Sequence, residues 1–395
     1  MKKSSLSALF EDTATAFRYK SDAAVRKAYL IFSLLNHPWL SAIASGAATL
    51  ALKLRLPVEF LIRKTVFDLF CGGEIIESTA LAVERLGKYA VHTILDYSVE
   101  GENTEAGFDH VMQETIRTIE RASKSPFIPF SVFKVTGLGH AALLEKVHSK
   151  SSLTKGEAEA FERVQHRVQA ICQKASELDI PILIDAEETW IQDPIDDLAY
   201  DMMKRYNAKR AIVFNTFQLY RVQGLLILKD AWEAAAREGY FLGAKIVRGA
   251  YMEKERGRAE KMGYENPIHP DKDATDKAFN EGLEFCIQHH DRIAMMCGSH
   301  NEYSSQYLTT LMKLHHIEPA DERVWFAQLY GMSDNISFNL ASEGYRVAKY
   351  VPYGPVRSVM PYLLRRAAEN TSVAGQSSRE LVLIRKELNR RKASR

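Results

Sequence analysis

Short hydrophobic runs recur along the chain from residue 90 onward, and each is rich in β-branched or aromatic side chains. Their length suits buried β-strands, while the segments between them have the charged, alanine-containing composition of amphipathic helices. We therefore predict eight strands, at residues 90–97, 127–135, 180–188, 210–217, 243–251, 292–300, 323–331 and 345–354.

Strands that alternate with helices indicate a parallel sheet, because parallel strands need a crossover connection. Eight such units within residues 86–395 predict an α/β protein, a (β/α)8 barrel, with a doubly wound open sheet as the alternative. Residues 1–85 have a helical pattern and no counterpart in a minimal barrel, so we expect an N-terminal helical segment packed on or next to it. Their most apolar stretch, residues 39–52, is too short to span a bilayer and predicts a packed helix, or alternatively a surface-bound amphipathic one.

The overall composition excludes several classes of protein. The 52 basic and 50 acidic residues nearly cancel, which argues against a nucleic-acid partner. The four cysteines lie far apart, as expected for free thiols in a reducing compartment, and no metal-binding motif occurs. A phosphate-binding loop and a complete dinucleotide-binding glycine motif are also absent from the sequence.

A polar or reactive residue stands near the end of each predicted strand. In a barrel the carboxyl ends of the strands form the active-site face. Lys134 and Asp185 both follow strongly apolar stretches, so we expect them to be partly buried and paired, either as a functional pair or as a structural ion pair. The full set is Asp96, Lys134, Asp185, Asn215, Arg248, His300, Tyr330 and Tyr350.

The stretch PYLLRRAAEN, residues 361–370, places four polar side chains on one helical face. These are Tyr362, Arg365, Arg366 and Glu369, at positions i, i+3, i+4 and i+7. Such a stripe is often a solvated ion pair. Two adjacent guanidinium groups also suit a clamp for a carboxylate or phosphate.

Several motifs, in the same order, resemble those of the proline dehydrogenase family. They are LIDAEETW (183–190), KIVRGAYMEKER (245–256), SHNEYS (299–304), QLYGMSDNISF (328–338) and YLLRRAAENTS (362–372). The resemblance runs from about residue 71 to about residue 373. An insert, residues 257–280, makes the chain more similar to the stand-alone, mitochondrial-type enzymes than to the bifunctional bacterial ones.

The resemblance implies a (β/α)8 barrel that holds FAD, oxidises L-proline to Δ1-pyrroline-5-carboxylate and passes electrons to a membrane quinone. It assigns catalytic positions to Lys134, Asp185, Lys245 and Arg248, with Lys134 also on the substrate side. It assigns the substrate site to Tyr251, Leu329, Tyr350, Tyr362, Arg365, Arg366 and Glu369, with the two arginines on the proline carboxylate. The FAD contacts implied are Ala186, Asn215, Val247, Arg248, Gly249, Ala250, Ser299 and His300.

Two departures from the family pattern bear on these assignments. Many bacterial members have Arg-x-x-Lys where this chain has Lys245 and Arg248, so which cation contacts the flavin N5 stays open. Asn215 stands where other members have glutamine, a longer amide.

Other functions remain to be weighed. Hydroxyproline dehydrogenase shares the implied fold and chemistry, but Tyr350 leaves little room for a ring hydroxyl. A flavin-free barrel could use Lys134 as a Schiff-base lysine. Residues 1–85 could instead form a membrane-surface or partner-binding module. The N-terminus lacks the apolar core of a signal peptide, so we expect a bacterial cytoplasmic protein in peripheral contact with the inner membrane, or the matrix side of the mitochondrial membrane in a eukaryote.

Overall fold

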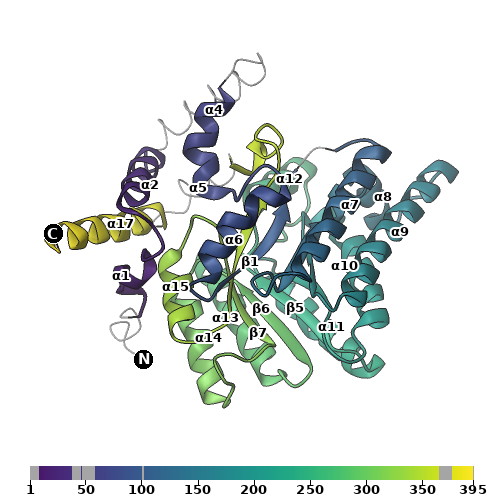
Figure 1. Ribbon diagram of the computed structural model, residues 1–395. Helices are drawn as coiled ribbons and strands as arrows, with labels where there is room; N and C mark the ends of the chain where they lie inside the picture. The colour runs from purple at the N-terminus through teal and green to yellow at the C-terminus, as the bar shows by residue number, and fades with distance from the viewer. Residues whose placement is uncertain (1–8, 38–45, 47–57, 100–101, 364–375, 395) are drawn as a thin grey trace. The chain divides into compact units, whose positions relative to one another are not determined.

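Eight parallel strands close into a barrel in the order of the chain, from β1 to β8 (Figure 1). The computed structural model describes residues 9–37, 46, 58–99, 102–363 and 376–394. All eight predicted strands are confirmed, and the doubly wound sheet is excluded. They are β1 (Val91–Tyr97), β2 (Phe130–Lys134), β3 (Ile182–Asp185), β4 (Val213–Gln218), β5 (Leu242–Val247), β6 (Ile293–Gly298), β7 (Val324–Leu329) and β8 (Val347–Tyr353).

The chain divides into two compact units, each described here by itself. Residues 101–327 form one unit, and residues 1–100 together with 328–395 form the other. We call them the central unit and the terminal unit. All four cysteines, Cys71, Cys172, Cys286 and Cys297, are buried free thiols, as the sequence predicted.

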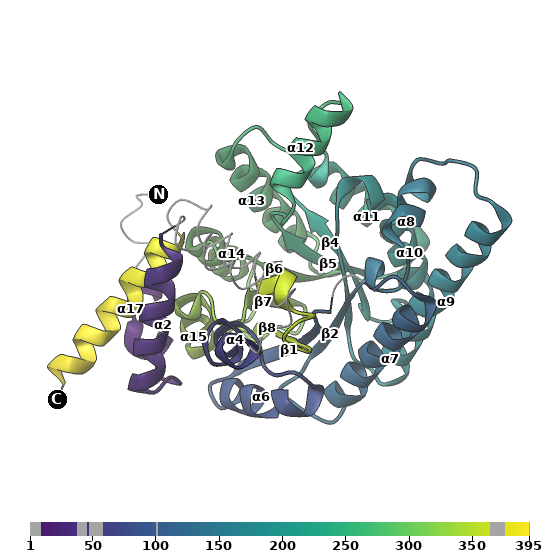
Figure 2. The same cartoon turned by 90° about the horizontal axis from the view of Figure 1, so that it is seen from above.

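The central unit packs helices against one face of its strands. Figure 2 shows α7, α9, α10, α11 and α13 on the outside of these strands. On the opposite, inner face, the Phe130 ring meets Phe214 and Trp325 edge to face, with centroid distances of 5.6 and 5.2 Å. The helices are α7 (Glu105–Ala122), α8 (Ala141–His148), α9 (Lys155–Glu177), α10 (Thr189–Tyr206), α11 (Gly224–Glu238), α12 (Met252–Met262), α13 (Lys272–Gln288) and α14 (Glu302–Leu314), with the 3-10 turn η4 (Val135–Gly137).

The terminal unit joins helices from both ends of the chain to β1 and β8. Helices α2 and α17 lie side by side (Figure 1), and Phe32, Leu383 and Ile384 belong to the same buried cluster. The other elements are η1 (Leu9–Glu11), α1 (Thr13–Ala16), α2 (Asp22–Leu35), α4 (Glu59–Ile62), the π-helical turn η2 (Arg63–Phe67), α5 (Asp68–Phe70), η3 (Ile76–Thr79), α6 (Ala80–Gly87), α15 (Asp334–Ser342) and α17 (Gln376–Ala393).

Across the described residues, none of the helices has both the length and the apolar character needed to cross a membrane.

A buried charge cluster fixes the loop after β7 within the terminal unit. Asp334, 2% exposed, pairs with Lys349 on β8 at 2.9 Å and with Lys20 at 2.8 Å. Burial alone would raise the pKa of Asp334, but the two lysines outweigh it and hold the pKa at about 2. Next to it, the backbone N–H of Ser333 donates to the buried carboxyl of Glu380 on α17 at 2.5 Å. Segments far apart in sequence thus converge on one loop.

We expect Asp334→Asn to destabilise the protein by about 3–5 kcal/mol, because it leaves Lys349 buried without its counter-charge. Asp68→Asn makes the same chemical change in an ion pair whose carboxylate is 69% exposed, and should cost less than about 1 kcal/mol. Equilibrium urea unfolding of the three proteins measures both effects. Equal stability of the two variants would contradict the role of Asp334.

Candidate active site

One carboxylate holds two lysines on the inner face of the central unit's strands. Lys134 Nζ lies 3.0 Å from Asp185 Oδ2, and Lys245 Nζ lies 2.5 Å from Asp185 Oδ1. The pairing of Lys134 with Asp185 predicted from the sequence is confirmed. We call these three residues the ion triad.

Strand register explains why the ion triad forms. Lys134 is four residues after Phe130, so both point to the inner face, and Asp185 is its direct partner on β3. Lys245 on β5 pairs with Thr216 on β4, two residues after inward-facing Phe214. Period-two alternation therefore brings all three charges to one side of the sheet.

Burial and charge oppose each other at Asp185. Its side chain is 13% exposed, and burial alone would raise the pKa of this carboxyl. The Lys245 and Lys134 ammonium groups outweigh burial and lower the pKa. Asp185 is thus an anion beside two cations, which leaves the triad with a net positive charge.

A second carboxyl joins the loops that follow β2 and β3. Glu187 is 3% exposed, and its carboxyl accepts from the backbone N–H of Thr136 at 3.0 Å and from the Thr136 hydroxyl. Its own N–H donates to Gln192 Oε1 at 2.8 Å, and its carbonyl accepts from Gln218 Nε2 at 2.7 Å. Burial raises the pKa of Glu187 to about 7, against the bonds to Thr136. Sequence reasoning missed Glu187 and Gln218, although Glu187 stands only two residues after Asp185.

Arg248 belongs to a separate network beyond the end of β5. Its guanidinium donates to Asp276 at 2.7 Å, to Ser299 Oγ at 2.9 Å and to Ser304 Oγ at 2.9 Å. The same group lies 4.2 Å from the centroid of the Phe279 ring. Lys245 and Arg248, left open as alternatives by the sequence, therefore occupy different surroundings: Lys245 the ion triad, Arg248 a fixed site between α13 and α14.

The segment after Arg248 runs close to a tyrosine ring. Gly249 has φ +142°, and a Cβ added there would come within 2.4 Å of the Tyr220 ring. Only glycine fits this backbone without strain. Ala250 is exposed, and Tyr251 is half-buried at the start of α12. Of the other predicted contacts in the central unit, Ala186 and Ser299 are buried, while Val247 and His300 are half-buried.

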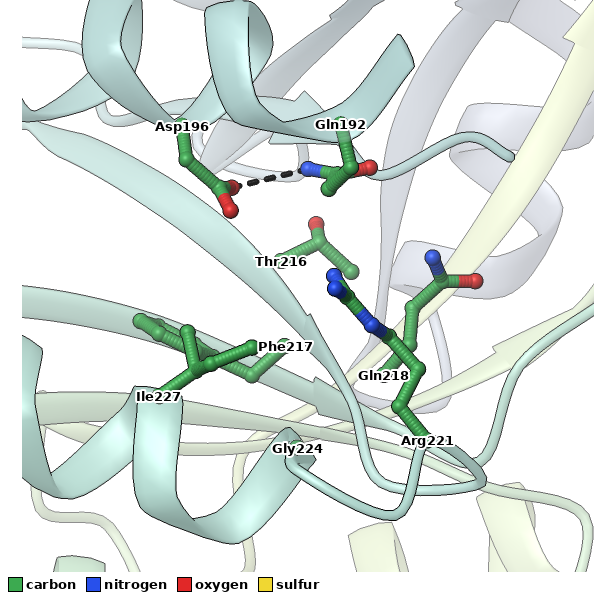
Figure 3. Close-up of a pocket in the computed structure, with 8 residues that line it drawn as sticks. All are labelled: Gln192, Asp196, Thr216, Phe217, Gln218, Arg221, Gly224 and Ile227. Carbon is green, nitrogen blue, oxygen red and sulfur yellow. Dashed lines mark hydrogen bonds between the residues drawn. The ribbon is translucent and has the colours of Figure 1, made fainter. Parts of the chain in front are cut away.

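Asn215 does not share the inner face with the ion triad. It is fully buried, and its Nδ2 donates to Asp196 Oδ1 on α10 at 2.7 Å. Figure 3 shows this Asp196 together with Gln192 of α10, opposite Arg221. Alternation instead places Thr216 and Gln218 on the face of Phe214. This geometry argues against Asn215 as a flavin contact.

The remaining predicted substrate residues belong to the terminal unit. Leu329 ends β7 and is half-buried, while Tyr350 on β8 is 6% exposed and its carbonyl accepts from the Tyr330 N–H at 2.8 Å. Tyr362, also 6% exposed, packs in the cluster of Val359 and Leu363. Arg365, Arg366 and Glu369 lie outside the described residues, so their shared face stays a prediction.

Comparison with known proteins shows similarity to proline dehydrogenases over most of the chain. The family model for proline dehydrogenase matches residues 80–379. Proline dehydrogenase 1, mitochondrial, of Dictyostelium discoideum is 33% identical over 96% of this chain and 74% of its own length. Its human namesake is 41% identical over 61% of this chain and 41% of its own length. The carbapenem antibiotics biosynthesis protein CarD of Pectobacterium carotovorum is 34% identical over 82% of this chain and 84% of its own.

Solved structures support the fold. The crystal structure of proline utilization A from Bdellovibrio bacteriovorus, inactivated by N-propargylglycine, aligns with a TM-score of 0.72 at 17% identity. It covers 91% of this chain, which spans only 38% of that longer protein.

The raised pKa of Glu187 predicts a pH-dependent stability. The folded state binds the proton of the Glu187 carboxyl more tightly than the unfolded state, with a pKa of about 7 against an ordinary 4.5. The resulting contribution to the free energy of unfolding is therefore full below about pH 4.5 and is lost as pH rises through about 7. We expect Glu187→Gln to flatten the fall in unfolding free energy between pH 5 and pH 8. Urea unfolding across this range measures it, with exposed Glu162→Gln on α9 as the control. Parallel curves for wild type and Glu187→Gln would contradict the prediction.

Proposed function

The chain belongs to the proline dehydrogenase family, and from this premise we propose that it oxidises L-proline to Δ1-pyrroline-5-carboxylate with FAD as cofactor and a quinone as electron acceptor. The observation that carries the proposal is the ion triad, which lies within the matched residues 80–379. Oxidation of a secondary amine needs precise placement of the substrate and a route for its proton more than a strong acid. A buried carboxylate between two lysines suits that need.

The residues beyond strands β4, β5 and β6 fit a flavin nucleotide. Arg248 offers a guanidinium held in one orientation by Asp276, and Ser299 offers a hydroxyl beside it. Lys245 adds an ammonium group that is 8% exposed. Cations and neutral donors suit the phosphates and the electron-rich ring of such a group. We propose Ala186, Val247, Arg248, Gly249, Ala250, Ser299 and His300 as the FAD contacts, with Gln218 in place of Asn215.

FAD, when bound, would supply the acceptor for the hydride that leaves proline C5. The protein's part is to bind, orient and shield the substrate. We assign the proline carboxylate to Arg365 and Arg366, oriented by Glu369. Tyr251, Leu329, Tyr350 and Tyr362 wall the ring and exclude water. Lys134 and Asp185 face the substrate amine, where the anionic carboxylate, held by its two lysines, orients the amine and stabilises its positive charge.

Hydroxyproline dehydrogenase, the alternative from the sequence, gains no support, since none of the relatives reported above is named for it. We also propose a cellular location, next to the membrane that holds the quinone. In a eukaryote this is the matrix side of the inner mitochondrial membrane, in keeping with the mitochondrial names of the Dictyostelium and human relatives. In a bacterium it is the cytoplasmic face of the inner membrane, with peripheral contact only.

An absorbance spectrum of the purified protein tests the function. We expect flavin bands that bleach when L-proline is added without oxygen. Proline reduces the flavin, and without oxygen or a quinone the reduced flavin cannot be reoxidised. Trans-4-hydroxy-L-proline at the same concentration is the matched control and should bleach the bands far more slowly. Flavin bands that proline leaves unchanged would contradict the substrate, and a colourless protein that cannot take up FAD would contradict the cofactor.

Removing the charge at the centre of the ion triad tests the proposed mechanism. We expect Asp185→Asn to lower kcat/KM for proline roughly 100-fold, because Lys134 and Lys245 then repel one another and lose their fixed positions. Asp201→Asn on α10 changes an aspartate that is 50% exposed and should leave kcat/KM unchanged. Steady-state kinetics with a soluble quinone measures both. A kcat/KM for Asp185→Asn within a few-fold of wild type would rule out a direct role.

A further inference from the structure

A fully buried carboxylate joins the segment after β5 to the start of α10. Glu255 on α12 is 0% exposed. One of its carboxylate oxygens accepts from the Thr189 N–H at 2.7 Å, and the other accepts from the Thr189 hydroxyl at 2.6 Å. Thr189 is the first residue of α10, and the preceding Glu188 makes no side-chain cap of its own. Glu255 therefore supplies the cap from another helix, at the positive end of the α10 dipole.

The same residue also holds the segment that precedes α12. The backbone N–H of Glu255 donates to the Tyr251 carbonyl at 2.9 Å, which closes the first turn of the helix. Immediately before it, the Arg248 carbonyl accepts from the Tyr220 N–H at 2.7 Å, and Gly249 lies against the Tyr220 ring. Residues 248–251 are thus fixed on one side by Tyr220 and on the other by Glu255.

Two weaker contacts complete the docking of α12. Lys254 pairs with Glu188 at 2.7 Å, but its side chain is 61% exposed. Arg258 pairs with Glu145 on α8 and lies 4.6 Å from the centroid of the Trp190 ring. Arg258 holds the far part of the helix, whereas Glu255 holds the turn next to Tyr251. Loss of the Glu255 contact should therefore loosen the Tyr251 end while α12 stays folded and docked.

We propose that Glu255 is a positioning residue for the substrate, whose contact with Thr189 sets the place of Tyr251 and of residues 248–250. The proposal rests on the proposed function, because Tyr251 is assigned there to the wall around the proline ring. Glu255 contacts none of Lys134, Asp185 and Lys245 through the bonds described, so the chemical step should depend on it less than substrate binding does. The expected signature is a raised KM with a nearly unchanged kcat.

Glu255→Gln tests the proposal, since the amide presents an N–H₂ to one of the two Thr189 donors. We expect KM for proline to rise about tenfold, with kcat within about twofold of wild type. Thr189→Val, which keeps the N–H and removes the hydroxyl, should raise KM less. In the double variant the two effects should not add, because both act on one contact. Glu253→Gln is the matched control, since it makes the same change on the same helix at a side chain that is 90% exposed.

Hydrogen–deuterium exchange separates this proposal from the proposed function. We expect amides of residues 249–255 to exchange faster in Glu255→Gln than in wild type or Glu253→Gln, whether or not the protein oxidises proline. If proline is not oxidised by any of the proteins, the function fails while the exchange still decides whether Glu255 holds this segment. Wild-type exchange, or faster exchange with an unchanged KM, would overturn the positioning role.

Discussion

The geometry of the site depends on one buried anion, Asp185, that holds two cations from different strands. A buried ion pair does not by itself favour folding, because desolvation offsets the Coulomb attraction. Three charges on the inner face are therefore poor evidence for a stabilising device and better evidence for a functional one. The sum of the triad, two lysines and one aspartate, is a single positive charge in surroundings where fields are little screened. A positive charge there suits the substrate carboxylate and the flavin that we propose for this site.

Two buried carboxyl groups, those of Glu187 and Glu255, hold segments that follow strands of the central unit. Glu187 fixes the loop after β2 through Thr136, and Glu255 fixes the segment after β5 through Thr189. Both accept hydrogen bonds from backbone N–H groups, those of Thr136 and Thr189, so each bond holds the main chain itself. Loops alone tend to be mobile. Here the segments that follow β2, β3 and β5 are tied to one another through these two carboxyl groups.

The sequence predicted the fold well because each strand is a separate apolar run and because the number of runs limits the topology. It predicted the pairing of Lys134 with Asp185, since both end neighbouring strands. It could not decide the face of Asn215, because β4 is buried along its whole length and shows no alternation between apolar and polar residues. The sequence could not predict the partner of Glu255 either, because Thr189 lies 66 residues away and the contact forms only when α12 packs next to α10. The arginine stripe at 365–366 remains known from the sequence alone.

The charge cluster around Asp334 has a consequence for how the protein is made. Lys20 leaves the ribosome long before Asp334, whereas Lys349 follows it after 15 residues and Glu380 reaches Ser333 across 47. A nascent chain that has just emerged past Asp334 therefore carries this loop without Lys349 and Glu380, two of the three partners named above. Contacts of such long sequence separation form late and slowly. Until α17 has been synthesised, the apolar face of α2 lacks its partner helix. A translation pause after residue 334 would therefore leave this face open to chaperones and proteases.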